Sequence, residues 1–312
     1  MLSTVRRILP VISALAASFL LVSCGQKQEQ KGKHVVGVSL LTRAHVFYKD
    51  LEEGLREQAA ADSIELLVSA ADFELGKQSS QIEDFITRKV DAIIVCPVDS
   101  RGVGPAIRKA NEANIPVFTA DIAAQEGFVV CHVASDNVAG GGLAGEFLAK
   151  LLAGQGAVAI IGQPTVTSVL DRTQGFKEAV GKFSGITIVA DVNGEGVRDK
   201  AMQAASDVLQ AHPDVRGIFG INDDSALGAL DAIQQLRRKE IVIVGYDATP
   251  PAVDAILKNT SLKADVVQYP KKIGAATIQA IKTFLSGSSV PKTIPVEVGI
   301  VDRVSLQKQS TP

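Results

Sequence analysis

The sequence lacks the features that mark a nucleic-acid-binding protein or a metalloenzyme. Its formal net charge is only −2, and no concentrated run of lysine and arginine follows the N-terminal segment, which argues against a nucleic-acid partner. The four histidines are widely separated and do not have the spacing of metal ligands; they are His34, His45, His132 and His212. The sequence therefore indicates neither a bound metal ion nor another cofactor.

Motifs for catalysis are also missing. No Gly-x-Ser-x-Gly nucleophile elbow occurs. Residues 140–142 are three glycines, followed by Gly145, but they lie inside a helical pattern and lack the Gly-Lys-Ser/Thr ending of a phosphate loop. Close packing between helices explains these glycines better. The sequence favours a binding protein over an enzyme.

The N-terminal segment is typical of a targeting signal. Arg6 and Arg7 precede an apolar run over residues 8–22 that is too short to span a membrane comfortably. Residues 21–24, Leu-Val-Ser-Cys, resemble the lipobox of bacterial lipoproteins, which implies cleavage before Cys24 and lipidation of that residue. An ordinary signal peptide, in which Cys24 has no special role, is the alternative. We expect a signal segment over residues 1–24 and a flexible tether over residues 25–33.

Cysteine is scarce, and the two cysteines beyond Cys24 are not expected to pair. Cys96 ends one apolar strand pattern and Cys131 lies in another, with a strand pattern at residues 117–120 between them in the sequence. In an ordered parallel sheet the two thiols would be too far apart for a disulfide. Both are expected to be small buried hydrophobic residues.

Strand and helix patterns alternate from His34 onward, in two similar series. Hydrophobic residues make up 46% of the chain and charged residues 21%, as in a globular protein. The first series predicts strands at residues 35–40, 64–68, 92–96, 117–120 and 129–133, and the second at 157–161, 186–190, 217–221, 241–245 and 262–267. Each series predicts a doubly wound parallel sheet covered by helices, so the fold class is α/β with two similar lobes.

The C-terminal segment adds a helix pattern and a strand pattern that the second lobe does not require. It predicts a helix at residues 273–285 and a final strand at 296–300. We expect it to return to the first lobe, which would then comprise residues 34–135 and 269–297. The second lobe would comprise residues 136–268 and 298–312. Several chain crossings would join the lobes and act as a hinge.

Polar side chains follow several of the predicted strands, where ligands bind in open parallel sheets. The stretch Asn222-Asp223-Asp224-Ser225 lies where a strand passes into a helix, so these residues also suit a turn and a helix N-cap. The strand-end residues with acceptor groups are Asp121, Asn222, Asp247 and Gln268. Arg172 offers a fork of donors, and the adjacent pair Phe47-Tyr48 offers flat faces. This combination suits a ligand covered in hydroxyl groups.

Five blocks of sequence carry a resemblance to a known family. They are ANEANIP at residues 110–116, HVASDNVAGG at 132–141, AHPDV at 211–215, NDDSALGAL at 222–230 and VGYDATP at 244–250. In this order and spacing, the chain resembles the periplasmic sugar-binding proteins of ABC transporters, of the ribose-binding type. The resemblance implies a type I periplasmic binding protein fold with a hinge. It also implies a monomer that closes on a monosaccharide or polyol and delivers it to a membrane permease.

The resemblance also assigns ligand contacts. It implies stacking by Phe47 and Tyr48, and hydroxyl binding by Asp121, Arg172, Asn222, Asp247 and Gln268. The chain departs from the ribose-binding pattern at three positions. His45 stands in place of an asparagine, Ile122 in place of an arginine, and Gly196 in place of an aromatic residue. We expect a pocket with one less polar side and more room, for which ribose is one candidate sugar among several.

Other functions are compatible with parts of this pattern. A lipid-anchored receptor on the extracytoplasmic side of a membrane, in the periplasm or at the cell surface, could also serve chemotaxis or signalling. LacI-type regulators share the two-lobe core, but they need a helix-turn-helix ahead of it, where this chain has its signal segment. A doubly wound enzyme is a third possibility, which turnover of a bound sugar would reveal.

Overall fold

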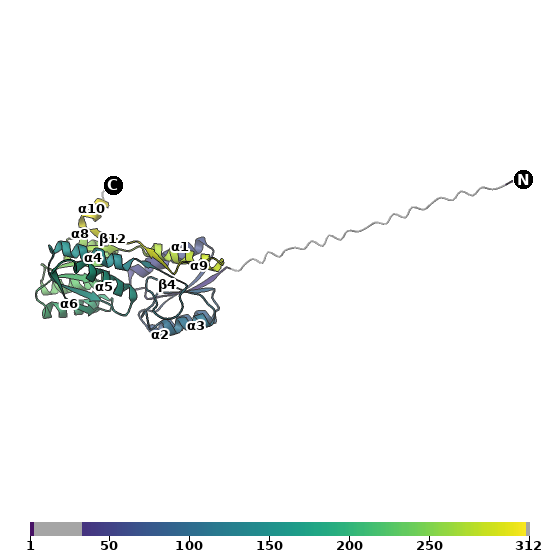
Figure 1. Ribbon diagram of the computed structural model, residues 1–312, viewed down its shortest axis with the longest axis horizontal. Coiled ribbons are helices and arrows are strands. Elements are labelled where there is room, and N and C mark those ends of the chain that lie inside the picture. The colour runs from purple at the N-terminus through teal and green to yellow at the C-terminus, as the bar shows by residue number, and fades with distance from the viewer. Residues whose placement is uncertain (3–32, 310–312) are drawn as a thin grey trace. The chain divides into compact units, whose positions relative to one another are not determined.

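The computed structural model of the protein describes residues 1–2 and 33–309. The predicted signal segment, the lipidation site at Cys24 and nearly all of the tether lie outside the described residues. Within the described part of the chain, no helix is both long and apolar enough to cross a membrane. Residues 33–309 form two six-stranded sheets flanked by helices, which are the two predicted lobes (Figure 1).

The first sheet has the order β11-β5-β4-β3-β1-β2, and all its neighbouring strands are parallel. Its strands are β1 (Val35–Leu40), β2 (Glu65–Ala70), β3 (Ala92–Val95), β4 (Val117–Ala120), β5 (Cys131–Ser135) and β11 (Thr293–Val296). Helices α1 (Val46–Ala61) and α9 (Pro270–Leu285) pack together on one face, and α2 (Leu75–Thr87) and α3 (Gly104–Glu112) on the other (Figure 1). The apolar strands are thus covered on both faces.

The second sheet repeats this plan with the order β12-β10-β9-β8-β6-β7. Its strands are β6 (Gln155–Gly162), β7 (Gly185–Asn193), β8 (Val215–Gly220), β9 (Val242–Asp247), β10 (Leu262–Val267) and β12 (Gly299–Asp302), of which β12 alone runs antiparallel to its neighbour. Its helices are α4 (Asn137–Leu151), α5 (Thr167–Val180), α6 (Arg198–Ala211), α7 (Asp223–Leu236), α8 (Pro250–Leu257) and α10 (Arg303–Gln309). Helices α4 and α5 pack as one pair and α6 and α7 as another.

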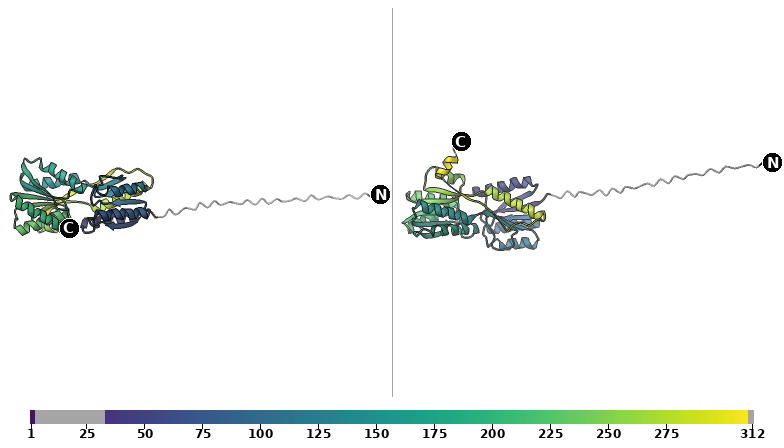
Figure 2. Two further views of the ribbon diagram at one scale, coloured as in Figure 1. Left: turned by 90° about the horizontal axis from the view of Figure 1, so that it is seen from below. Right: turned by 45° about the horizontal axis from the view of Figure 1, so that its top comes forward.

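The chain passes between the lobes in three places: between β5 and α4, between β10 and α9, and between β11 and β12. The last passage is visible as the yellow segment in both views of Figure 2. The single strand predicted at residues 296–300 is therefore wrong, because Val296 pairs with Ser135 in one sheet and Gly299 with Val267 in the other. An apolar pattern cannot tell which sheet a strand joins. The pairings of Val296 and Gly299 support the lobe boundary that we propose between residues 297 and 298.

Most other predicted elements are present, with shifted ends. The fifth strand begins at Cys131 and not at residue 129, and β2 extends to Ala70. No pattern predicted the short helix α10. Cys96 and Cys131 are both unpaired and buried, and β4 lies between their strands, as predicted.

The glycines of α4 serve close packing, as predicted. A Cβ atom on Gly141 would lie 1.9 Å from the carbonyl oxygen of Arg172 in α5, and one on Gly140 would lie 2.2 Å from the hydroxyl of Tyr246. A Cβ on Gly145 would lie 2.8 Å from Ala179 Cβ and 2.9 Å from the Phe176 carbonyl oxygen. Gly142 differs, since a Cβ there would meet nothing within 4 Å. The absence of side chains at Gly140 and Gly141 lets α4 approach the two residues that shape the site described next.

Candidate functional site

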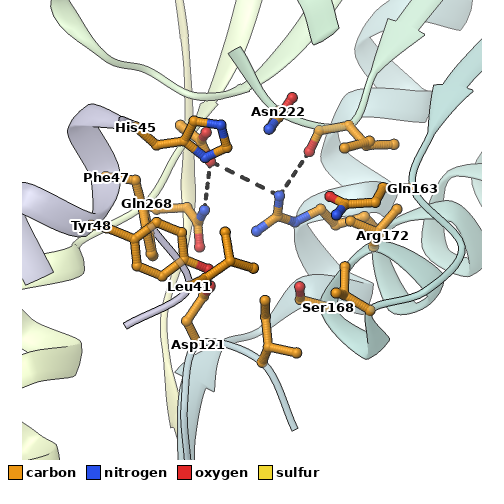
Figure 3. Close-up of a pocket in the computed structure, with 15 residues that line it drawn as sticks. Leu41, His45, Phe47, Tyr48, Asp121, Gln163, Ser168, Arg172, Asn222 and Gln268 are labelled. Atoms are coloured by element: carbon orange, nitrogen blue, oxygen red, sulfur yellow. Dashed lines mark hydrogen bonds and ion pairs between the residues drawn. The ribbon is translucent and has the colours of Figure 1, made fainter. Parts of the chain in front are cut away.

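A pocket lies between the lobes, at the carboxyl ends of strands from both sheets (Figure 3). The cavity itself is small, with a volume of about 40 Å³. The structure brings together around it all eight residues that the sequence singled out: His45, Phe47, Tyr48, Asp121, Arg172, Asn222, Asp247 and Gln268. No cluster of side chains suited to a metal ion occurs in residues 33–309.

One wall of the pocket is aromatic and comes from the start of α1. His45 is the residue that precedes the helix, and Phe47 and Tyr48 lie in its first turn. The rings of Phe47 and Tyr48 meet edge to face, 5.2 Å apart between centroids, and His45 stacks on Tyr48 at 6.2 Å. Burial, followed by the charge of Asp121, raises the pKa of Tyr48, so its hydroxyl stays protonated. That hydroxyl donates a hydrogen bond of 2.6 Å to Asp121 Oδ2.

Only one of the two carboxylate oxygens of the buried Asp121 has a hydrogen-bond partner in residues 33–309. It follows β4 in a left-handed backbone conformation with φ of 67°. Its Oδ1 atom is buried without a hydrogen-bond partner among the described residues. Burial raises the pKa of this carboxyl to about 6, and the nearby charge of Arg172 limits the rise. An unpaired buried acceptor is costly for the protein alone, so Asp121 is well suited to a ligand hydroxyl.

Arg172 supplies donors from the opposite lobe. Its side chain is only 4% exposed, and its guanidinium lies 3.8 Å from the centre of the Tyr246 ring. Nε donates to Asn137 Oδ1 at 2.9 Å and Nη1 donates to the carbonyl oxygen of Ile221 at 2.7 Å. These contacts fix the group, which points into the pocket toward Tyr48 (Figure 3). A fixed fork loses little entropy when it binds a ligand.

Asp247 lies between Arg172 and Gln268. Its Oδ1 atom is 3.9 Å from Arg172 Nη1 and accepts a 2.7 Å hydrogen bond from Gln268 Nε2. Ser135 in turn donates to Gln268 Oε1 at 2.6 Å. Burial raises the pKa of Asp247, while Arg172 opposes the rise. The result is a line of linked acceptors and donors that runs from one lobe to the other.

The turn after β9 holds Asp247 in an uncommon backbone conformation. The φ angles of Asp247 and Ala248 are 118° and 54°. Two buried carboxyls fix this turn, because Asp223 accepts from the Thr249 amide at 2.6 Å and Asp265 accepts from the Ala248 amide at 3.3 Å. Burial raises the pKa of Asp223 to about 7, and burial also raises the pKa of Asp265 well above its ordinary value. Such strain at a strand end is typical of functional sites.

Asn222 combines both roles that the sequence left open. It caps α7, since its Oδ1 accepts from the Ser225 amide at 2.8 Å. It also lines the pocket, where its Nδ2 donates to the carbonyl oxygen of Gly196 at 3.0 Å. The space expected at Gly196 is partly filled, because a Cβ there would lie 2.4 Å from Gln163 Oε1. The additional room predicted at that position is therefore smaller than expected.

Sequence reasoning missed several lining residues. Gln163 follows β6 directly, so the strand-end rule that selected Asp121 could have found it. Leu41 follows β1 in the same way. The remaining unpredicted residues are Val166, Ser168, Val169 and Ile221. Val166, Ser168 and Val169 could not be predicted as pocket residues, because their sequence pattern is that of any helix N-terminus.

Polar contacts join the lobes on two sides of the pocket. On one side, His45 Nε2 lies 3.0 Å from Asp224 Oδ2 in α7. On the other, Thr167 Oγ1 accepts from the Ala123 amide at 3.0 Å and donates to the Ala123 carbonyl at 3.2 Å. Ser100 Oγ accepts from the Thr167 amide at 3.0 Å. The lobes are thus bridged around the pocket.

Two doubly wound lobes with a polar pocket between them define a ligand-binding protein of the cleft type. The family model described as "Periplasmic binding protein domain" matches residues 36–289. The chain belongs to this family.

Similar proteins support this family assignment. The chain is 32% identical over 298 residues to the ribose import binding protein RbsB of Salmonella typhimurium, covering 95% of this chain and 98% of the relative. It is 33% identical over 286 residues to the protein of that name in Bacillus subtilis, covering 88% and 92%. Among solved structures, an ABC transporter solute binding protein from Mycobacterium smegmatis with bound glycerol is 32% identical, with a TM-score of 0.83 and coverage of 89% and 96%. These relatives are binding proteins and not enzymes.

Proposed function

We propose that this protein is the solute-binding component of an ABC transporter, which captures a monosaccharide or related polyol between its lobes and delivers it to a membrane permease. The observation that carries the proposal is the set of fixed, buried polar groups around one pocket. Asp121 offers an acceptor from the first lobe, and Asp247 and Arg172 offer an acceptor and donors from the second. A hydroxyl group both donates and accepts, so a polyol can use all three.

The aromatic wall supports the same class of ligand. Phe47 and Tyr48 present apolar ring surface beside hydrogen-bonding groups. A sugar ring has an apolar C–H face and a hydroxylated edge, which such a wall and such polar groups match together. Hydrogen bonds to charged groups contribute about 1.5–3 kcal/mol each. A few of them are enough for micromolar affinity, about 8 kcal/mol.

The proposal names a class of ligand rather than ribose. Relatives of similar identity include a D-ribose/D-allose-binding protein from Pseudomonas aeruginosa and a xylitol-binding protein from Mycolicibacterium smegmatis. Two lining residues, His45 and Ile122, depart from the ribose-binding pattern. Ribose is therefore one candidate among pentoses, hexoses and sugar alcohols.

We also propose that the protein is exported and anchored to a membrane by a lipid. Importers of this family capture solutes outside the cytoplasm, so the location is extracytoplasmic. Residues 1–23 would be removed as a signal segment, and the lipidated Cys24 would anchor a monomer to the membrane. Labelling of cells with a radioactive fatty acid tests this: the wild-type chain should carry label and Cys24→Ser should not. Label on the Cys24→Ser protein would contradict the anchor.

Calorimetric titration of the chain lacking residues 1–24 against pentoses, hexoses and sugar alcohols tests the proposed function. At least one ligand should bind, and Asp247→Asn should weaken it at least tenfold while leaving the melting temperature within a few degrees. Asp214→Asn, at an exposed position, is the matched control and should bind normally. Failure of every sugar and polyol to bind, or unchanged affinity in Asp247→Asn, would overturn the assignment.

A further inference from the structure

One part of the pocket wall is aliphatic. Leu41 and Ile122 come from the ends of β1 and β4, and Val166 and Val169 come from the start of α5. Their side chains are between 1% and 4% exposed and belong to one hydrophobic cluster. All four also border the empty space of the pocket. They therefore present apolar surface to whatever the pocket holds.

The fold fixes this wall next to Asp121. Ile122 follows Asp121 in the chain, and the next residue, Ala123, makes both of its hydrogen bonds with Thr167 Oγ1. Val166 precedes Thr167, so this pair of bonds brings together, from opposite lobes, the segments that carry Ile122 and Val166. Leu41, Asp121 and Ser168 lie together at the end of the pocket away from Asn222 (Figure 3). A ligand bound there would have a hydroxyl at Asp121 and an apolar group beside it.

We propose that this aliphatic wall is a methyl subsite and that the ligand is a 6-deoxy sugar, in which CH3 replaces the terminal CH2OH of a hexose. This rests on the proposed function. A terminal hydroxyl placed against Ile122, Val166 and Val169 would lose its bonds to water and gain none. A methyl group loses no hydrogen bond and fills the same space. Apolar pockets of this kind discriminate by about 10- to 100-fold.

The aliphatic residues also help to seal the lobes, and the two roles make different predictions. A seal alone would not distinguish two sugars that differ only at C6, because it contacts the other lobe and not the ligand. A methyl subsite would distinguish them. Pairs of sugars matched at every other carbon therefore separate the two roles.

The experiment is calorimetric titration of the full chain, solubilised in detergent, with four matched pairs: D-glucose and 6-deoxy-D-glucose, D-galactose and D-fucose, D-allose and 6-deoxy-D-allose, and L-mannose and L-rhamnose. In at least one pair the deoxy member should bind about tenfold more tightly than its partner. Equal or tighter binding of the hydroxylated member in every pair that binds would overturn the methyl subsite. So would binding confined to sugars and polyols that lack a methyl group. Absence of binding by these eight sugars and also by every pentose and sugar alcohol would instead overturn the proposed function.

Two variants link the preference to the wall. Ile122→Thr places a hydroxyl at this surface and should reduce the deoxy preference from about tenfold to less than threefold. Ile122→Val removes one methylene without adding polarity, and it should keep the preference. If the ratio of the two affinities is the same in Ile122→Thr as in Ile122→Val, the wall does not contact the methyl group and the inference is wrong. The ratio is informative even if both variants bind more weakly.

Discussion

His45 and Asp224 meet across the cleft, with 3.0 Å between Nε2 of the first and Oδ2 of the second. His45 precedes α1 in the first lobe, and Asp224 lies in the first turn of α7 in the second. The pair also borders a second cavity, which shares His45, Phe47 and Asp247 with the pocket described above. Because the two residues belong to different lobes, their contact exists only when the lobes are together.

The first prediction concerns this pair. His45→Gln and Asp224→Asn should each weaken ligand binding about 1.4- to fivefold, because a partly exposed pair contributes about 0.2–1 kcal/mol to closure. The double variant should be no weaker than the worse single variant. Affinities of all four proteins give the coupling energy directly. Strictly additive losses would show that the two side chains do not act together.

The second prediction concerns Thr167. Thr167→Val keeps the shape of the side chain but removes both hydrogen bonds to Ala123. At about 1 kcal/mol for each bond, the closed form should lose stability and ligand affinity should fall about five- to thirtyfold. Small-angle scattering with subsaturating ligand should show a more open average shape.

Thr165→Val is the control for Thr167→Val. Thr165 is exposed and contributes only its carbonyl oxygen to the bridge, which accepts from the Ser100 amide at 3.0 Å. Its substitution should leave affinity and scattering unchanged. Equal behaviour of the two variants would mean that the Thr167 hydroxyl has no part in closure.

The third prediction is that Asp121→Asn stabilises the empty protein and weakens binding. The folded-state pKa of Asp121 is about 6, above its ordinary value of 3.8. Its contribution to stability is thus present below pH 4 and is lost as the pH rises through 6. With 1.36 kcal/mol per pKa unit, the loss at neutral pH is about 3 kcal/mol as an upper figure.

Urea unfolding at pH 5 and pH 7.5 checks this prediction. The stability difference between Asp121→Asn and the wild type should be larger at pH 7.5, where the wild-type carboxyl is ionised. Ligand affinity should fall at least tenfold in the same variant. Asp214→Asn, at an exposed position, should show neither change. A stability difference that is the same at both pH values would contradict the role given to this carboxyl.

The fourth prediction compares two neighbouring glycines of α4. Gly141→Ala should destabilise the protein by several kcal/mol, since the new Cβ would lie 1.9 Å from the Arg172 carbonyl oxygen. It should also weaken ligand binding by displacing Arg172. Gly142→Ala has open space and should stabilise the helix by about 0.5–1 kcal/mol. Thermal melts of both variants decide the matter, and similar effects of the two substitutions would be inconsistent with the helix contact.

Much of the fold could be predicted because it follows from local patterns. Buried parallel strands are short apolar runs, and helices show one apolar face, so the alternation was readable from residue 34 onward. The cap at Asn222 followed from its position between a strand and a helix. Strand ends of one sheet lie at one edge, which is why the positions of Asp121, Asp247 and Asn222 after apolar runs marked them as site residues.

The remaining features depend on contacts between distant parts of the chain. The lobe boundary at residues 297–298 was expected, but one strand was predicted across it, because Val296, Val298 and Ile300 alternate with other residues as in a single strand. The strands on either side of the boundary join different sheets. The bridge from Thr167 to Ala123 joins residues 44 positions apart, and no local pattern predicts it. The aliphatic wall was foreseen only at Ile122. Val166 and Val169 reach it because α5 of the other lobe is placed opposite.

The crossing between β11 and β12 also limits how the protein can acquire its shape. One edge of the first sheet is formed by residues 293–296, and one edge of the second by residues 299–302. Both lobes therefore remain unfinished until almost the whole chain has been synthesised, although the first lobe starts at residue 35. A nascent chain that stops short of β11 has no complete lobe, so assembly of the two halves is tied to a single late event.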